Sequence, residues 1–176
     1  MNLIETYKKS PHSDKGTLHS YIEYYNQLFE PYKDKKINFL EIGLFFGHSI
    51  DFWDKYFNPE SNILSIDIDL KLSNYNFSNR VTLIQGDSTK LKTSKLFKNS
   101  SLNIIIDDGD HSIGNQIKTF NNFKSKMAKG GLYIIEDIQN IDKDKQSLLD
   151  LHKNCKVYDL RHLKGRYDDV FILYKF

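Results

Sequence analysis

The chain has 176 residues, a length that fits one domain with a single core. Its 25 Lys and Arg residues nearly balance 23 Asp and Glu residues, so the clustered basic face of a nucleic-acid-binding protein is not expected. The sequence has one cysteine, a polar N-terminus without a signal peptide's apolar stretch, and no apolar run of the ~18 residues that span a membrane, so we expect a soluble, cytoplasmic protein without disulfides.

Apolar periodicity predicts short strands that alternate with helices. Residues 1–15 should form an irregular arm or a short helix, within an N-terminal helical arm over 1–36. The predicted helices cover 17–32, 49–57, 113–127 and 144–153, with Ser49 capping the second and Lys129–Gly131 closing the third. The predicted strands cover 37–42, 62–67, 81–85, 104–106, 133–135, 156–160 and 170–174. This alternation predicts one α/β domain over 1–176, with a mainly parallel sheet, helices on both faces and an antiparallel pair at its end.

A glycine turn, Glu-Ile-Gly-Leu-Phe-Phe-Gly at residues 41–47, follows the first strand. The dinucleotide fingerprint needs a glycine two residues after the first, where a pyrophosphate approaches the backbone, but this chain has Phe45 there. A cofactor without phosphates therefore fits better than NAD or FAD. Asp67 ends the second strand, where an acid commonly accepts hydrogen bonds from ribose hydroxyls. Asp87 ends the third strand, where it can accept a hydrogen bond from an adenine amino group or stabilise the loop. The two acids together predict a nucleoside site.

This glycine turn, followed by acids after the second and third strands, resembles the class I S-adenosylmethionine-dependent methyltransferases. The resemblance implies a Rossmann-like sheet of strand order 3-2-1-4-5-7-6 with strand 7 antiparallel. It also implies that the first acid and the glycines line the methionine part of S-adenosylmethionine, and that the second acid binds its ribose. The cofactor-binding residues predicted from this part of the chain are Glu41, Gly43, Gly47, Ser49, Asp67, Asp87 and Asp107.

Two further strands also end in acids, at 107–111 (Asp-Asp-Gly-Asp-His) and at 136–137 (Glu-Asp). Carboxylates that gather at one sheet edge repel each other unless a cation is present. A set of oxygen ligands without a nearby cysteine suits Mg²⁺, with Mn²⁺ or Ca²⁺ as alternatives. His111 has an unperturbed pKa of ~6.5, which suits removal of a proton from a hydroxyl. These residues predict a metal-assisted acid–base site.

The same acids are similar to those of the metal-dependent sugar O-methyltransferases of the macrocin and mycinamicin type. The resemblance implies that Asp108, Glu136 and Asp137 bind the metal and that His111 is the general base, with Asp108 and His111 as the catalytic pair. Asp110 stands where this family often has Ser, so the roles of Asp107 and Asp110 stay open.

A third similarity to this family lies near the N-terminus, at 13–16 (Ser-Asp-Lys-Gly) with His19 and Tyr21. In the family this segment helps to close the cofactor pocket. The resemblance therefore adds Asp14, Lys15 and Tyr21 to the predicted cofactor-binding residues.

The leading prediction is an S-adenosylmethionine-dependent O-methyltransferase, assisted by a divalent metal, that acts on a hydroxyl of a sugar or a related small molecule. Two alternatives stay open: a metal-independent methyltransferase acting on a small molecule or a nucleic acid, and a non-catalytic nucleoside-binding module. No insertion is long enough for a substrate lid, so we expect an acceptor pocket that is open or completed by another subunit of a homo-oligomer.

Overall fold

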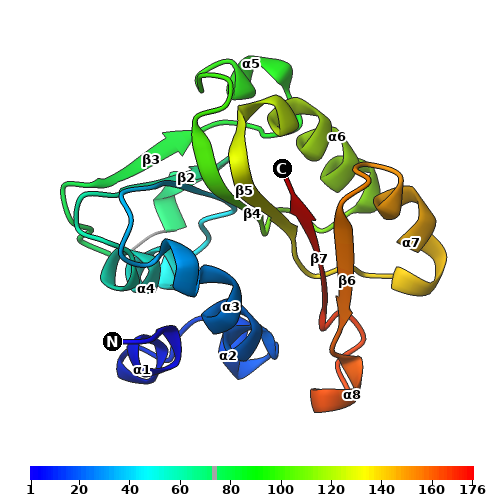
Figure 1. Cartoon of the computed structure of the whole chain (residues 1–176), viewed down its shortest axis with the longest axis horizontal. Helices are drawn as coiled ribbons and strands as arrows, with labels where there is room; N and C mark the ends of the chain where they lie inside the picture. Colours follow the sequence, from blue (N-terminus) through cyan, green and yellow to red (C-terminus); the bar gives the residue numbers. More distant parts are fainter. Residues whose placement is uncertain (73–74) are drawn as a thin grey trace.

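Seven strands form one mixed sheet within residues 1–72 and 75–176, the part of the chain that the computed structural model describes (Figure 1). The strands are β1 (Asn38–Ile42), β2 (Asn62–Asp67), β3 (Val81–Gln85), β4 (Leu102–Asp107), β5 (Met127–Ile135), β6 (Cys155–Asp159) and β7 (Val170–Lys175). Their order is β3-β2-β1-β4-β5-β7-β6. The paired strands among β1 to β5 run parallel, and β7 runs antiparallel to β5 and β6. The predicted strand order and the reversed strand are confirmed.

Helices cover both faces of the sheet, as predicted. They are α1 (Leu3–Lys9), α2 (Asp14–Thr17), α3 (Tyr21–Phe29), α4 (His48–Tyr56), α5 (Leu91–Ser94), α6 (Ile113–Phe123), α7 (Ile141–Leu149) and α8 (Arg161–Lys164), with 3₁₀ turns η1 (Glu30–Tyr32), η2 (Leu70–Leu72) and η3 (Lys124–Lys126). Figure 1 shows α1, α3 and α4 on one side of the sheet and α6 and α7 on the other. Among the helices of the described ranges, none combines the length and apolarity needed to cross a membrane.

Alternation along the strands separates two cores, because successive side chains point to opposite faces. Phe39 and Ile104 pack with α1, α3 and α4, whereas Leu40 and Ile105 pack with α6 and α7. The same alternation directs the acids that follow: Glu41, two residues after Phe39, points to the α4 side, where it meets Trp53. The sequence period therefore decides which acids share a face.

The N-terminal segment differs from the single helix predicted over 17–32. Helix α2 ends at Thr17 and α3 begins only at Tyr21. The break is stabilised by Asp169, whose carboxylate accepts hydrogen bonds from the backbone N and the Oγ of Ser20. Ahead of it, α1 forms because Asn2 and Glu5 make a reciprocal capping box.

The helix predicted over 113–127 is too long. Helix α6 ends at Phe123, and Met127 already pairs with Leu102 as the first residue of β5. Lys129–Gly131 lie inside β5 and do not close a helix. Strand pairing with β4 has overridden the apolar spacing that placed Met127 on the helix.

Two predicted helix starts are also wrong. Helix α7 spans 141–149 and not 144–153, because the Asn140 side chain accepts a hydrogen bond from Lys143 N and starts the helix earlier. Helix α4 begins after Gly47, so Ser49 is not its cap. The Ser49 hydroxyl instead donates to Glu41 Oε2 at 2.7 Å.

Candidate active site

A cavity of about 1020 Å³ opens at the sheet edge where β1, β2, β3 and β4 end. Its size is at the upper end of the roughly 300–1,000 Å³ of ligand pockets. The predicted site residues that line it are Asp14, Gly43, Gly47, Ser49, Asp67, Asp87, Asp107, Asp108 and His111. Exposed apolar side chains, including Leu18, Phe45 and Ile68, also line it. The cavity thus combines apolar surface with a small number of polar groups, as cofactor sites do.

The glycine turn packs backbone against backbone with the acidic loop after β4. Gly43 has φ +98°, and a Cβ built there would lie 2.0 Å from the carbonyl oxygen of Asp108. Asp108 N in turn donates to the carbonyl of Ile42 at 2.8 Å. Position 43 needs glycine for both its backbone angle and this close approach.

Asp67 and Asp87 are held by the turns that follow their strands. Asp67 Oδ2 accepts hydrogen bonds from the backbone N–H of Leu44, at 2.7 Å, and of Phe45, at 3.3 Å. Asp87 Oδ1 accepts from the backbone N and hydroxyl of Thr89, at 2.9 and 2.6 Å. Asp67 therefore connects β2 to the glycine turn while facing the cavity, where it stays a predicted ribose ligand.

Lys15 is buried behind the cavity wall, among carboxylates from β1 and from the ends of β4 and β5. Its side chain is 1% exposed, and Nζ lies 3.1 Å from Glu41 Oε1, 2.6 Å from Asp108 Oδ2 and 2.5 Å from Glu136 Oε2. Burial lowers the pKa of Lys15, but these carboxylates outweigh it and hold that pKa well above its usual value. Lys15 therefore carries a fixed positive charge at this point.

Glu41 and Glu136 share this buried environment. Glu41 Oε1 also faces Trp53 Nε1 at 3.4 Å, and Glu136 Oε1 accepts a hydrogen bond from Tyr25 Oη at 2.5 Å. Burial raises the pKa of both acids, and the charge of Lys15 opposes that rise. Because Glu41, Lys15 and the buried Tyr21 lie behind the wall, their contact with a cofactor stays a prediction.

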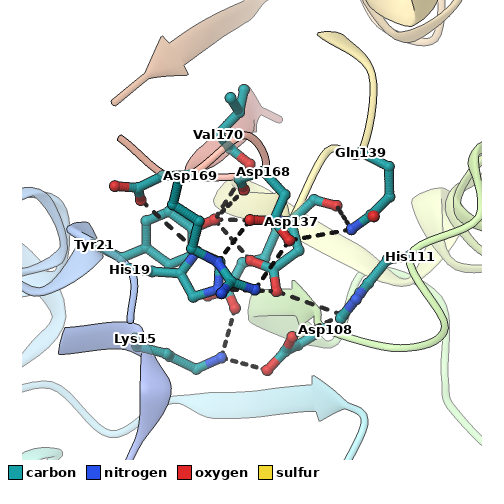
Figure 2. Close-up of polar contacts among 12 residues, drawn as sticks. Lys15, His19, Tyr21, Asp108, His111, Asp137, Gln139, Asp168, Asp169 and Val170 are labelled. Atoms are coloured by element: carbon teal, nitrogen blue, oxygen red, sulfur yellow. Dashed lines mark hydrogen bonds and ion pairs between the residues drawn. The ribbon is translucent and has the colours of Figure 1, made fainter. Parts of the chain in front are cut away.

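Asp108, His111 and Asp137 come together on the other side of Asp108 (Figure 2). His111 Nε2 lies 3.2 Å from Asp108 Oδ1 and 3.8 Å from Asp137 Oδ2. Burial lowers the pKa of His111, but the hydrogen bond and charge of Asp108 outweigh it, and the net effect raises that pKa to about 9. Burial, then the charge of Asp108, raises the pKa of Asp137 to about 7. His111 and Asp137 also have positive φ, 60° and 53°, a conformation that is uncommon outside glycine and often marks functional sites.

The sequence interpretation missed a neighbouring group on the far side of Asp137. His19 Nε2 lies 3.3 Å from Asp137 Oδ2 (Figure 2). Asp168 Oδ1 pairs with Arg166 Nε at 2.6 Å. Because β7 is antiparallel to β5, the segment before β7 reaches the sheet edge at which β5 ends. The pair Asp168–Asp169 directly before an apolar run was the signal that could have found it.

Within the described ranges, two groups of side chains could each hold a metal ion: Asp108, His111 and Asp137, and His19, Asp137 and Asp168. In the first, the carboxylates of Asp108 and Asp137 lie together beside the cavity, and their oxygens fit a divalent cation, with His111 next to both acids. Glu136, a predicted ligand, faces Lys15 and Tyr25 instead. The metal-ligand assignment as a whole stays a prediction.

Residues 40–138, more than half of the chain, match the model of a methyltransferase domain. The chain belongs to this family. The match runs from β1 through the acidic loop to Glu136 and Asp137, so it covers the cavity and the acids beside it.

Curated O-methyltransferases are among the relatives. The chain is 27% identical over 136 residues to 8-demethyl-8-alpha-L-rhamnosyl tetracenomycin-C 2'-O-methyltransferase of Streptomyces olivaceus, covering 72% of this chain and 35% of that protein. It is 30% identical over 133 residues to demethylmacrocin O-methyltransferase of Streptomyces fradiae, covering 70% of this chain and 33% of that protein. The chain thus spans about a third of the length of the curated relatives it matches.

Solved structures share the fold at lower identity. The MycE methyltransferase of mycinamycin biosynthesis, in complex with Mg and SAH, superposes with a TM-score of 0.77 at 23% identity, covering 99% of this chain and 55% of that one. An O-methyltransferase from Bacillus cereus in complex with SAH gives a TM-score of 0.68 at 18% identity, covering 97% and 88%. The fold is therefore the Rossmann-like class I methyltransferase fold.

Proposed function

We propose that this chain is the catalytic domain of an S-adenosylmethionine-dependent O-methyltransferase that acts on a hydroxyl of a sugar or related small molecule with the help of a divalent cation. One observation carries the proposal: a single cavity has the glycine turn and Asp67 on one side and the Asp108–His111 pair on the other. The named activities of the sugar O-methyltransferase relatives support the same substrate class.

The residues divide the work between donor and acceptor. The glycine turn and Asp67 would bind the methyl donor, which supplies an electrophilic methyl group, and the arm over 1–36 would close this site through Asp14. Asp108 and Asp137 would hold a divalent cation, whose charge supplies Lewis-acid assistance to an acceptor hydroxyl. A cation held by these carboxylates would lower the pKa of His111, because it offsets the negative charge beside the imidazole. His111 could then accept the hydroxyl proton. The chain's main contribution is to hold the reacting groups in line.

The test is transfer of a labelled methyl group from S-adenosylmethionine to a panel of free and glycosidically linked sugars. We expect transfer that EDTA removes and Mg²⁺ restores. His111→Ala should lower kcat by about 10²–10⁴-fold, and Asp108→Asn should abolish the EDTA-sensitive transfer. Asp150→Asn changes an exposed acid at the end of α7 that does not line the cavity, and it should leave transfer intact.

The outcomes separate the alternatives. EDTA-insensitive transfer would support a metal-independent methyltransferase that uses Asp108 and His111 alone. Donor binding without transfer to any acceptor would support a binding module. No donor binding at millimolar concentration would refute all of these functions.

A further inference from the structure

We propose that Lys15 is an internal counter-ion that competes with a divalent cation for Asp108 and Glu136, and so sets the affinity of the site for the metal. The inference rests on the proposed function, because it concerns the cation assigned to that site. It starts from a disagreement: the resemblance assigns Glu136 to the metal, but the structure has that carboxylate on a buried ammonium group.

Both oxygens of Glu136 are engaged by protein donors while Lys15 is in place. Its Oε2 lies 2.5 Å from Lys15 Nζ, and its Oε1 accepts the hydrogen bond of Tyr25. Both partners are buried on the same face of the sheet, so water is poorly placed to substitute for either. The Glu136 carboxylate can therefore turn toward a metal only if Lys15 releases it.

The two carboxylate oxygens of Asp108 face different partners. Its Oδ2 lies 2.6 Å from Lys15 Nζ, while Oδ1 faces His111 at 3.2 Å. A divalent ion held by Asp108 and Asp137 would therefore lie on the opposite side of one carboxylate group from the ammonium. The Lys15 ammonium group and a divalent ion that share one carboxylate in a partly buried site repel each other strongly.

The surroundings are negative enough to attract more than one positive charge. The carboxylates of Glu41, Asp108 and Glu136 lie 3.1, 2.6 and 2.5 Å from the Lys15 ammonium group, and Asp137 lies next to His111. Lys15 and His111 supply two positive charges against the four carboxylates of Glu41, Asp108, Glu136 and Asp137. This leaves an attraction for a further cation, which the Lys15 ammonium group reduces.

The direct test is Mn²⁺ binding to the metal-free protein, followed by electron paramagnetic resonance and calorimetry. Lys15→Met removes the charge at nearly constant length, and it should tighten Mn²⁺ binding by at least about tenfold. Lys15→Arg keeps the charge and should not reproduce the gain. Lys118→Met, which removes an exposed charge on α6, is the matched control and should leave the affinity unchanged. Adding Glu136→Gln to Lys15→Met should cancel most of the gain.

The wild-type protein provides a second test that needs no variant. The buried Lys15 ammonium group should give a protected ¹H–¹⁵N resonance, and millimolar Mg²⁺ should shift or remove it as the carboxylates change partner. A resonance that stays unchanged in millimolar Mg²⁺ would overturn the proposal even if Lys15→Met does not fold. Equal Mn²⁺ affinity of wild type and a folded Lys15→Met would overturn it as well.

Calorimetry with S-adenosylhomocysteine on the same samples separates this inference from the proposed function. Donor binding together with unchanged Mn²⁺ affinity would refute the role of Lys15 and leave methyl transfer standing. Absence of donor binding in the wild type would refute the proposed function itself.

Discussion

The acids that line the cavity and the acids behind it are held in opposite ways. Asp67 and Asp87 accept hydrogen bonds from backbone and hydroxyl groups of their own turns and still face the cavity. Glu41 and Glu136 are fully enclosed and depend on Lys15 for their charge balance. All four stand at or near the end of a strand, so position along a strand does not distinguish an acid that faces the cavity from one that is buried behind it. Side-chain direction and the nearest cation do.

Removing Lys15 should have the largest effect on stability. Lys15→Met leaves buried carboxylates without their partner, which should lower the free energy of unfolding by about 3–5 kcal/mol in the absence of metal. Lys90→Met breaks the exposed Lys90–Asp87 pair, at 3.7 Å with 63% and 40% exposure, and should cost less than about 1 kcal/mol. Urea denaturation measures the free energy of unfolding of both variants. Similar losses would contradict the proposed difference between the acids that line the cavity and the acids behind it.

Gly43→Ala should rank next, because Gly43 joins the two regions. The new Cβ would meet the Asp108 carbonyl at 2.0 Å, and the backbone angle is unfavourable as well. We expect a loss of about 3 kcal/mol or more. Gly165→Ala has a similarly positive φ of +69° but no atom within 4 Å, so it should cost only about 1–2 kcal/mol. Comparing the thermal unfolding of the two variants separates the effect of the contact with the Asp108 carbonyl from the effect of the positive φ. Equal losses of stability would show that the contact has no effect.

Asp67→Ala should affect the cavity more than the core. It removes the acceptor of the Leu44 and Phe45 N–H groups, for an expected loss of about 2 kcal/mol in stability. Calorimetry should also show at least about tenfold weaker binding of S-adenosylhomocysteine. A destabilised variant with wild-type affinity would assign Asp67 to the turn alone.

Phe45→Gly should have the smallest effect, and a favourable one. Phe45 is 62% exposed and has φ +46°, which disfavours a side chain. Glycine should raise the free energy of unfolding by up to about 1 kcal/mol. Thermal denaturation that shows a clear loss would mean that the ring packs more tightly than its exposure indicates.

Much of the fold could be predicted from the sequence because the strands carry strong local signals. The boundaries predicted for β2 and β3 coincide with those observed, and the reversed β7 followed from the short connection before it. The errors arose where distant contacts decide: Asp169 breaks the N-terminal helix, and pairing with Leu102 makes Met127 a strand residue.

The sequence could predict which residues gather at the candidate site, but not which side chains they pair with. The motifs led to Asp108, His111 and Asp137, which do come together. That Lys15 would reach Glu136 across the chain, and that Arg166 and Asp168 would border Asp137, depends on packing that no local pattern records.

A crystal structure with S-adenosylhomocysteine and Mg²⁺ tests the central claim most directly. We predict the nucleoside in the 1020 Å³ cavity with its ribose at Asp67, the sulfur directed toward His111, and the metal on Asp108 and Asp137. Nucleoside bound outside this cavity, or a metal bound away from Asp108, would contradict the account.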